Sequence, residues 1–126
     1  MPDTNSRVLR SDDVGEHLPL TNLAFAILLA LADRDLHGYA LIKEIDAHSG
    51  GYGKLRSGTL YSAMRRLDAA GLIHESGERP TPDRDDQRRR YYGITELGLA
   101  VVRAEATRLA GLLDEAQSKN LVGERA

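Results

Sequence analysis

The stretch RSGTLYSAMRRLDAAGLI, residues 56–73, decides the fold class. Leu60, Met64 and Leu67 recur at i, i+4 and i+7, which predicts a helix with one apolar face. Ser57 is the residue expected to cap this helix, and Gly71 is expected to close it. The apolar residues after Gly71 predict that the chain continues into a strand.

The side of this helix opposite Leu60 carries only small or cationic side chains. At about 100° per residue, that side holds Gly58, Ser62, Arg65 and Ala69, flanked by Tyr61 and Arg66, with Thr59 in the first turn. A face without bulk can enter a major groove about 12 Å wide, and the first-turn N–H groups favour phosphate. For the helix taken alone, an alternative stays open: both arginines are merely solvated and Tyr61 covers the edge of the core.

A basic hairpin is expected to follow. LIHES (72–76) and RRRYYGI (88–94) predict two short strands joined by an exposed tip. Arg88, Arg89 and Arg90 would lie beside the helix, as in a wing that reaches the sugar-phosphate backbone. Strand alternation separates Tyr91 from Tyr92, so one tyrosine is expected on the core and the other among the arginines.

Three further helices complete the pattern. The first is expected from Thr21 or Asn22 to about Asp33, and the second opens at Gly38 and ends at Gly50-Gly51. The last is capped by Thr95 and carries a seam of Leu99, Val102, Ala106, Leu109 and Leu113, which Leu112 widens. The fold class is therefore mainly α (α+β), a winged helix-turn-helix domain with a C-terminal dimerisation helix. The expected organisation is a flexible arm (1–19), the DNA-binding domain (20–95), the dimerisation helix (96–118) and a flexible tail (119–126).

The seam on the last helix is too wide to stay exposed on a small domain, which favours a homodimer. The alternative is that the helix folds back on its own domain. Phe25 is the only phenylalanine. It can face the core, which is favoured, or an interhelical pocket for a small apolar ligand.

The composition of the chain limits which functions are expected. The net charge of -2 argues mildly against nucleic acid, but residues 53–92 hold nine basic and six acidic side chains. The absence of cysteine excludes disulfides and thiolate metal sites and fits a cytoplasmic protein. No apolar run reaches the ~20 residues of a membrane span, and no signal peptide is recognised.

An enzyme is not expected. The four histidines, His17, His37, His48 and His74, lack any metal-ligand spacing, so no metal, cofactor or catalytic residue is expected. His37, at the start of a helix, is expected to stabilise a turn.

Taken together, these segments resemble the PadR-like transcriptional regulators. ILLALADRDLHGYALIKEI resembles the first two helices of that family, SGTLYSAMRRLDAAGLI its recognition helix, RRRYYGIT its wing return and TELG the start of its last helix. The resemblance covers about residues 20–115 and implies a homodimeric winged-helix DNA-binding protein of the short subfamily. Such a protein is commonly a repressor, released in many members by a small, often aromatic ligand. By position, Ser57, Gly58, Thr59 and Tyr61 match the DNA-facing start of the recognition helix, and Arg88 and Arg89 match the wing.

Two departures from the family pattern stand out. Ser62 replaces the usual proline, and the longer wing tip carries Asp83, Asp85 and Asp86.

The sequence therefore predicts a transcriptional regulator that binds a pseudo-palindromic operator in double-stranded DNA. Its predicted DNA-contacting residues are Lys54, Arg56, Ser57, Gly58, Thr59, Tyr61, Ser62, Arg65, Arg66, Arg88, Arg89 and Arg90. Lys54, Arg56, Arg88 and Arg89 are expected to hold phosphate, and Ser57, Thr59, Ser62 and Arg65 to meet base edges. The alternative function is a winged-helix module that binds another protein and no DNA.

Overall fold

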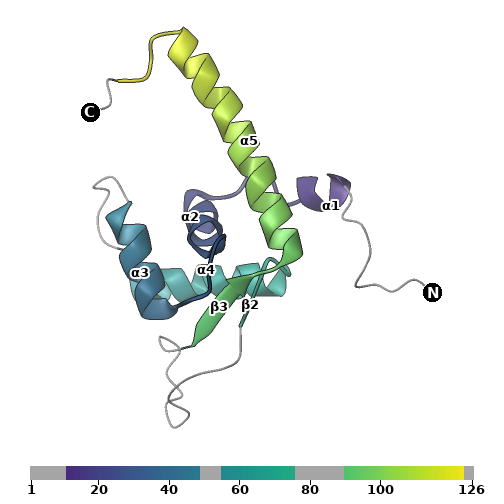
Figure 1. Cartoon of the computed structure of the whole chain (residues 1–126), viewed down its shortest axis with the longest axis vertical. Coiled ribbons are helices and arrows are strands. Elements are labelled where there is room, and N and C mark those ends of the chain that lie inside the picture. The colour runs from purple at the N-terminus through teal and green to yellow at the C-terminus, as the bar shows by residue number, and fades with distance from the viewer. Residues whose placement is uncertain (1–10, 49–54, 76–89, 124–126) are drawn as a thin grey trace, which may run out of the picture.

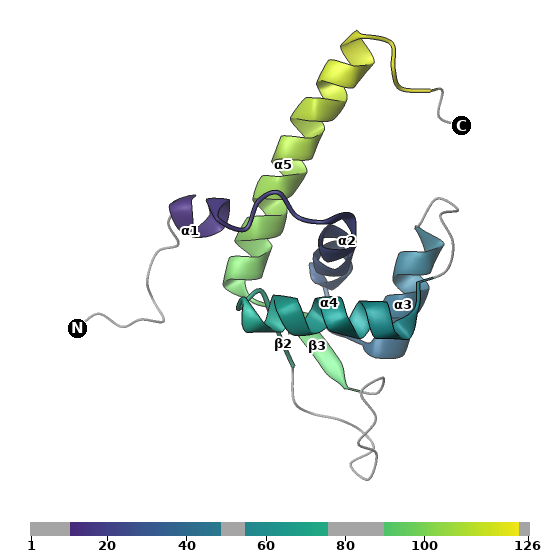
Figure 2. The same ribbon diagram turned by 180° about the vertical axis from the view of Figure 1, so that it is seen from behind.

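The computed structural model describes residues 11–48, 55–75 and 90–123 (Figure 1). The helices are α1 (Ser11–Gly15), α2 (Asn22–Leu31), α3 (Gly38–Ala47), α4 (Ser57–Ala69) and α5 (Glu96–Ser118), and the strands are β1 (Leu36–His37), β2 (Ile73–Glu75) and β3 (Tyr91–Ile94). Seen from both sides, α4 runs across one end of the molecule, and α5 rises away from the other elements (Figures 1 and 2). The mainly helical fold class with a small antiparallel sheet is confirmed.

Helix α2 lies at the centre of the packing because it is apolar on nearly every side. Ile27, Leu28 and Leu31 are buried, and the helix contacts α3, α4 and α5. Thr21 caps it, since its hydroxyl oxygen accepts a hydrogen bond of 3.0 Å from the backbone N–H of Ala24. The central position of this helix and its cap are as the sequence predicts, although the helix ends two residues before Asp33.

The sheet contains a strand that the sequence did not predict. The strand order is β1-β3-β2, and both pairings are antiparallel, with Leu36 opposite Tyr92 and Ile73 opposite Ile94. Strand β1 has only two residues, which is too short to show any periodicity. It ties the start of α3 to the returning strand of the wing.

The close of α4 confirms the role predicted for Gly71. This residue has φ +81°, and its N–H donates to the carbonyl oxygen of Asp68 while that of Leu72 donates to Leu67. Both bonds together form a Schellman motif, in which the left-handed position favours glycine. Leu67 and Leu72 are both buried, so the turn also packs on the core.

The structure differs from the expected flexible arm at residues 11–19. These residues form α1 and a following turn, and α1 contacts α5. Val14 and Leu18 are partly buried against the hydrophobic core. Two apolar side chains are too few to establish a helical period, although they are four positions apart, but they suffice to hold a short helix against existing apolar surface.

Candidate nucleic-acid interface

The two faces of α4 are largely those that the sequence predicts. Leu60, Met64 and Leu67 are buried, together with Ala63. Gly58, Thr59, Arg65, Arg66 and Ala69 are exposed, and Ser62 is half-buried. The exposed face is therefore free of large apolar side chains, and both of its cations belong to one helix.

The prediction that Tyr61 lies on the DNA-contacting face is wrong. Its side chain is only 7% exposed and belongs to the hydrophobic core. Tyr61 is one residue from Leu60, about 100° around the helix, so a ring at this angle can turn under the helix and add to the buried face. Tyr61 thus supports α4 from beneath.

The start of α4 has no side-chain cap. The N-cap residue is Arg56 rather than Ser57, and no side-chain hydrogen bond caps the helix there. Ser57, Gly58 and Thr59 then occupy the first helical turn, where backbone N–H groups have no partner within the helix. Arg56 and these three residues are exposed, so this turn presents uncapped N–H donors and the positive end of the helix dipole.

Gly58 leaves open space on the exposed face. A methyl group added at its α-carbon would meet no atom within 4 Å in the part of the chain that the structure describes. The space beside the first turn is therefore free for a partner to approach the backbone closely.

Ser62 and Arg66 are joined on the exposed face. The Arg66 guanidinium Nη1 donates a hydrogen bond of 3.1 Å to the Ser62 hydroxyl oxygen, one turn earlier. Because the bond uses one of the five N–H donors of the guanidinium, the others remain to meet phosphate or a base edge. A proline at position 62 could not make this bond, so the departure from the family pattern holds an arginine along the helix.

The turn before α4 is fixed by a contact that the sequence did not reveal. Asp46, in the last turn of α3, accepts a hydrogen bond of 3.0 Å from the backbone N–H of Leu55. This bond ties α3 to the residue directly before Arg56. Its signal is a single aspartate beside a glycine-rich turn, which is too common a pattern to assign a role.

The strand pair β2 and β3 supports the wing, whose tip lies outside the described residues. Lys54, Arg88 and Arg89 lie outside them too, so their predicted phosphate contacts stay predictions. Arg90 is half-buried, with its Nε 3.7 Å from the carboxylate of Glu75 on the neighbouring strand. This pairing makes Arg90 part of the base of the wing.

The two tyrosines divide as alternation requires. Tyr92 is the one on the core, 8% exposed. Tyr91 is half-buried, and its ring lies edge-on to that of His37 with centroids 5.2 Å apart. His37 in turn caps α3, because its Nδ1 accepts a hydrogen bond of 3.1 Å from the N–H of Ala40. The turn-stabilising role expected of His37 is confirmed.

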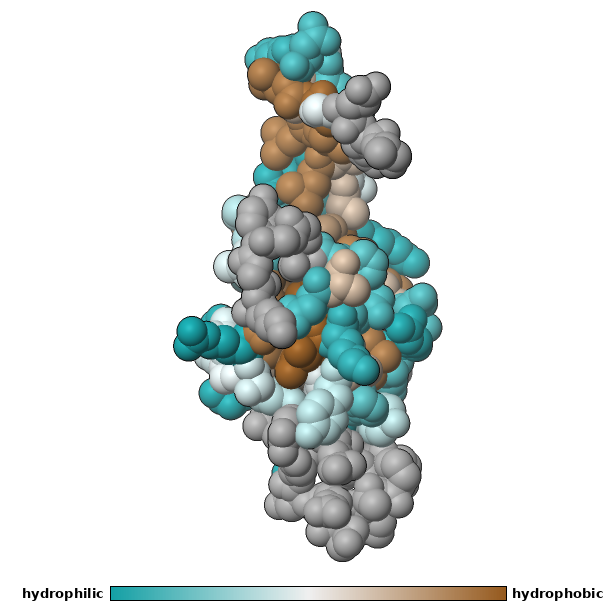
Figure 3. Space-filling view, turned by 90° about the vertical axis from the view of Figure 1, so that its left-hand side faces the viewer, coloured by the Kyte–Doolittle hydropathy of each residue, from teal (hydrophilic) through white to brown (hydrophobic). Residues whose placement is uncertain are grey.

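Helix α5 divides its apolar seam between two environments. Val102 is 4% exposed and Leu99 packs against the core, so the prediction that Val102 is free for dimer contacts is wrong. Beyond Glu105 the same seam is uncovered: Ala106 is exposed, Leu109 is half-buried, and Leu112 and Leu113 are 56% and 43% exposed. Figure 3 shows apolar surface continuing along the projecting part of α5. The first half of the seam thus packs on its own domain, as the alternative expected, and dimer contacts through the uncovered second half stay a prediction.

Glu105 is a residue that sequence reasoning missed. It is the one buried charged side chain among the described residues, with 1% exposure. Arg108 donates to it from Nε at 2.7 Å and from Nη2 at 2.8 Å, and the N–H of Leu20 donates at 3.0 Å. The hydrogen bonds from Arg108 hold the pKa of the Glu105 carboxyl below its ordinary value, although burial opposes this shift. The sequence signal that could have revealed this residue is a glutamate within the apolar seam of the last helix.

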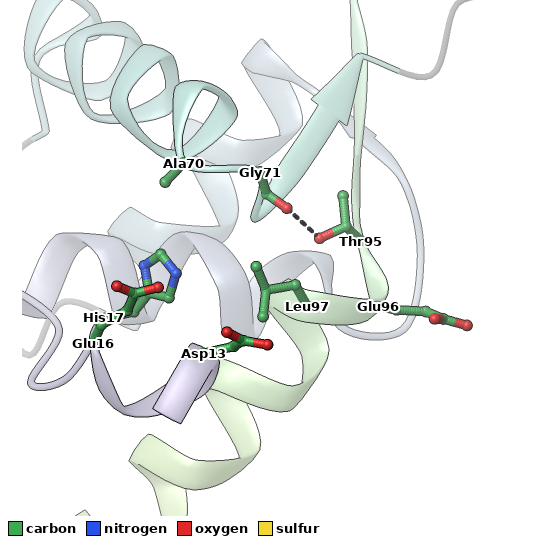
Figure 4. A pocket seen from close by; sticks show the side chains of 8 residues that line it. All are labelled: Asp13, Glu16, His17, Ala70, Gly71, Thr95, Glu96 and Leu97. Atoms are coloured by element: carbon green, nitrogen blue, oxygen red, sulfur yellow. Dashed lines mark hydrogen bonds between the residues drawn. The ribbon is translucent and has the colours of Figure 1, made fainter. Parts of the chain in front are cut away.

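A surface pocket of about 520 Å³ lies between α1, the end of α4 and the start of α5 (Figure 4). It is lined by Asp13, Glu16, His17, Ala70, Gly71, Thr95, Glu96 and Leu97. Phe25 is not among the lining residues and packs partly buried against the core, which is the favoured of its two expected positions. The wall of this pocket is acidic, so it differs in character from the apolar pocket expected for an effector.

Within the described ranges, no group of three or more histidine or acidic side chains is arranged to hold a metal ion. In the same part of the chain, every helix is too short or too polar to cross a membrane.

The three helices α2 to α4, the antiparallel strands that follow and the exposed face of α4 define a winged helix-turn-helix protein. A model of the transcriptional regulator PadR-like family matches residues 27–104, and the chain belongs to this family. Regulators of this family bind DNA, act as dimers and are not enzymes.

The chain is also similar to individual proteins and to solved structures. A transcriptional regulator of Mycobacterium tuberculosis is 36% identical over 89 residues, which are 71% of this chain and 77% of that protein. An uncharacterised 37.1 kDa protein of a Streptomyces fradiae transposon is 37% identical over 86 residues, or 68% of this chain, which spans only 22% of that relative. The crystal structure of a PadR family regulator from Eggerthella lenta is 27% identical, with a TM-score of 0.62, and the match covers 90% of this chain and 97% of that one.

Proposed function

We propose that this chain is a sequence-specific transcriptional regulator that places the start of α4 in the major groove of its operator. The observation that carries the proposal is the combination at this helix of an uncapped first turn, open space beside Gly58 and exposed Arg65 and Arg66. A small, cationic, donor-rich helix face suits both the width and the charge of the groove.

The contacts divide by chemistry. Arg56, with Lys54, Arg88 and Arg89, is assigned to phosphate, because arginine and lysine at the rim of the helix and on a wing neutralise the backbone. Ser57, Thr59, Ser62 and Arg65 are assigned to base edges, since they lie on or beside the first turns of the groove-facing surface. Arg66, held by Ser62, is assigned to the groove edge beside them.

Salt dependence tests the DNA contacts. We expect the logarithm of the binding constant for DNA from the chain's own promoter to fall linearly with the logarithm of salt concentration, by about 0.9 for each phosphate neutralised. Random DNA of equal length should bind more weakly at every salt concentration. A flat response, or equal affinity for both duplexes, would reject sequence-specific binding and favour the alternative module that binds a protein partner.

We further infer that the functional unit is a homodimer formed through the uncovered half of the α5 seam. The support is the exposure of Leu112 and Leu113 on a helix that projects beyond its own domain. Two-fold symmetry would match a pseudo-palindromic operator with half-site centres about 34–36 Å apart. Sedimentation of the parent at micromolar concentration should give a dimer, and replacement of both leucines by glutamate should give a folded monomer. A parent that sediments as a monomer would rule out this assembly.

Repression relieved by a small apolar or aromatic ligand is the form of regulation we propose, and its support is the family resemblance. A thermal-shift screen with phenolic compounds and with planar cationic drugs separates an apolar effector from one that fits the acidic pocket beside α1. No stabilisation by either class would argue against control by such ligands.

A further inference from the structure

The buried carboxylate of Glu105 lies where α5 leaves its own domain. The buried residues of this helix are Gly98, Val101, Val102 and Glu105, and no later position on it is buried. The helix continues to Ser118, and Figures 1 and 2 show this part rising clear of the other elements. Glu105 is therefore the last point at which α5 is held by the domain that carries α4.

The contacts of Glu105 connect two parts of the chain that are far apart in sequence. Its Oε2 accepts from the N–H of Leu20, 85 residues earlier and directly before the cap of α2. Helix α2 packs against α4, so a rigid path leads from the recognition helix through α2 to this carboxylate. Arg108, one turn further along α5, holds both carboxylate oxygens and so fixes the rotamer in which Glu105 reaches Leu20.

Apolar packing alone would define the angle between α5 and the rest of the domain less sharply. Apolar contacts are non-directional, whereas a carboxylate that accepts three hydrogen bonds fixes both distance and orientation. The Glu105 side chain is buried whereas that of Arg108 is 41% exposed, so loss of Arg108 would leave a buried carboxylate without its ion-pair partner.

We propose that Glu105 is a positioning residue that sets the angle between α5 and the winged helix-turn-helix domain, and thereby the operator half-site spacing that the dimer accepts. The inference rests on the proposed dimeric DNA-binding function. Glu105 itself lies outside the proposed DNA-contacting and dimer-contacting surfaces. In this proposal it fixes how these two surfaces are oriented relative to each other.

The projecting part of α5 is long enough for a small change in its angle to matter. From Ala106 to Ser118, α5 extends about 20 Å, and a tilt of about 10° at Glu105 displaces its far end by roughly 3.5 Å. With the far ends of α5 held together in a two-fold dimer, the same tilt in each protomer rotates both DNA-binding domains, so the separation and the orientation of the two α4 helices change.

The first test uses a pool of randomised double-stranded DNA. The parent, Glu105→Gln and the matched control Glu115→Gln are each used to select duplexes, which are then sequenced. Glu115 is a suitable control because it is an exposed carboxylate of the same helix, paired with Lys119 at 3.0 Å, and lies in the projecting part. We expect the parent and Glu115→Gln to select one spacing, and Glu105→Gln to select the same half-site sequence at two or more adjacent spacings.

The second test needs no DNA. Because the chain has no cysteine, Ala69→Cys on the exposed face of α4 gives one spin-label site per protomer and one distance across the dimer. We expect a single narrow distance in the parent and in Glu115→Gln, and a distribution broadened or shifted by several ångströms in Glu105→Gln. If Glu105→Gln does not fold at the assay temperature, Arg108→Gln carries both tests with the same expected direction, because it removes the clamp and leaves the Leu20 bond.

The outcomes distinguish failure of the role proposed for Glu105 from failure of the proposed DNA-binding function. An unchanged distance distribution and one unchanged spacing in a folded variant would overturn the role of Glu105 while leaving the proposed function intact. Dimers without selection of any two-fold sequence would overturn the DNA function, and with it the spacing claim. A folded parent that gives no distance across protomers would overturn the dimer and the inference together.

Discussion

Replacing Gly58 with alanine separates the two jobs of α4, which are to fold and to approach DNA. The added methyl group meets no atom of the described residues within 4 Å, and Gly58 lies in the first turn of the helix. Alanine is favoured over glycine within a helix by up to about 1 kcal/mol, with less expected in the first turn. We therefore expect Gly58→Ala to leave the free energy of unfolding unchanged or to raise it by about 0.5 kcal/mol.

The same methyl group should weaken operator binding. Gly58 lies on the groove-facing side, and extra bulk in a close-packed contact typically costs about 1–3 kcal/mol. At about 1.4 kcal/mol for each factor of ten, this corresponds to a loss of roughly 5- to 150-fold in affinity. The phosphate contacts remain, so the slope of the salt dependence should change by less than about one.

Gly111→Ala is the matched control. It also adds a methyl group in open space, on α5 and far along the chain from α4. At about 100° per residue, Gly111 points roughly opposite Leu109 and away from the apolar seam. It should stabilise the fold by about 0.8–1 kcal/mol and leave DNA affinity unchanged. Fluorescence anisotropy with promoter DNA and urea unfolding measure both quantities. A folded Gly58→Ala variant that binds within about twofold of the parent would refute close approach of this turn to the groove.

Three further outcomes are expected. Gly98→Ala should lower the free energy of unfolding by about 1–3 kcal/mol or more in urea titrations, because its methyl group would clash with the carbonyl oxygen of Leu72; a variant as stable as the parent would show that α5 can shift freely there. His37→Ala should cost about 1 kcal/mol of stability through loss of the α3 cap, with no change in the salt slope of DNA binding; an unchanged urea midpoint would argue against the cap. Because the pKa of Glu105 is lowered in the folded state, the ionised carboxylate stabilises the fold fully above about pH 4.5, and this contribution is lost as pH falls through the lowered pKa. The difference in unfolding free energy between the parent and Glu105→Gln should therefore shrink in acid. A difference that does not depend on pH would contradict this.

The helices of the DNA-binding domain were accessible from sequence because their apolar periods are long and their ends carry strong local signals. Thr21, Gly71 and Thr95 each close or open a helix through a hydrogen bond or backbone conformation that their residue type favours. Strand β1 and helix α1 escaped prediction for the opposite reason. Each is too short for a period, and each exists because a distant surface, β3 or α5, accepts it.

Side-chain roles were harder to assign than elements. Tyr61 and Val102 were placed at surfaces because an aromatic beside arginines and a valine within a seam both suit contacts with a partner. Both side chains are buried because they pack in the hydrophobic core of the protein itself. Asp46 and Glu105 were missed because their partners are backbone N–H groups of other segments, and a sequence does not show which backbone group will need an acceptor.

The distribution of charge resolves how a weakly acidic chain can present a helix to DNA. The exposed start of α4 carries Arg56 and uncapped N–H groups, whereas the pocket at its far end is lined by Asp13, Glu16 and Glu96. Phosphate is attracted to the first end and repelled by the second, and the helix dipole adds to this difference with the same sign. In the proposed complex the acidic end thus does not oppose binding. It lowers affinity for arrangements in which α4 approaches DNA by its C-terminal end, so that a net charge of -2 is compatible with one productive orientation.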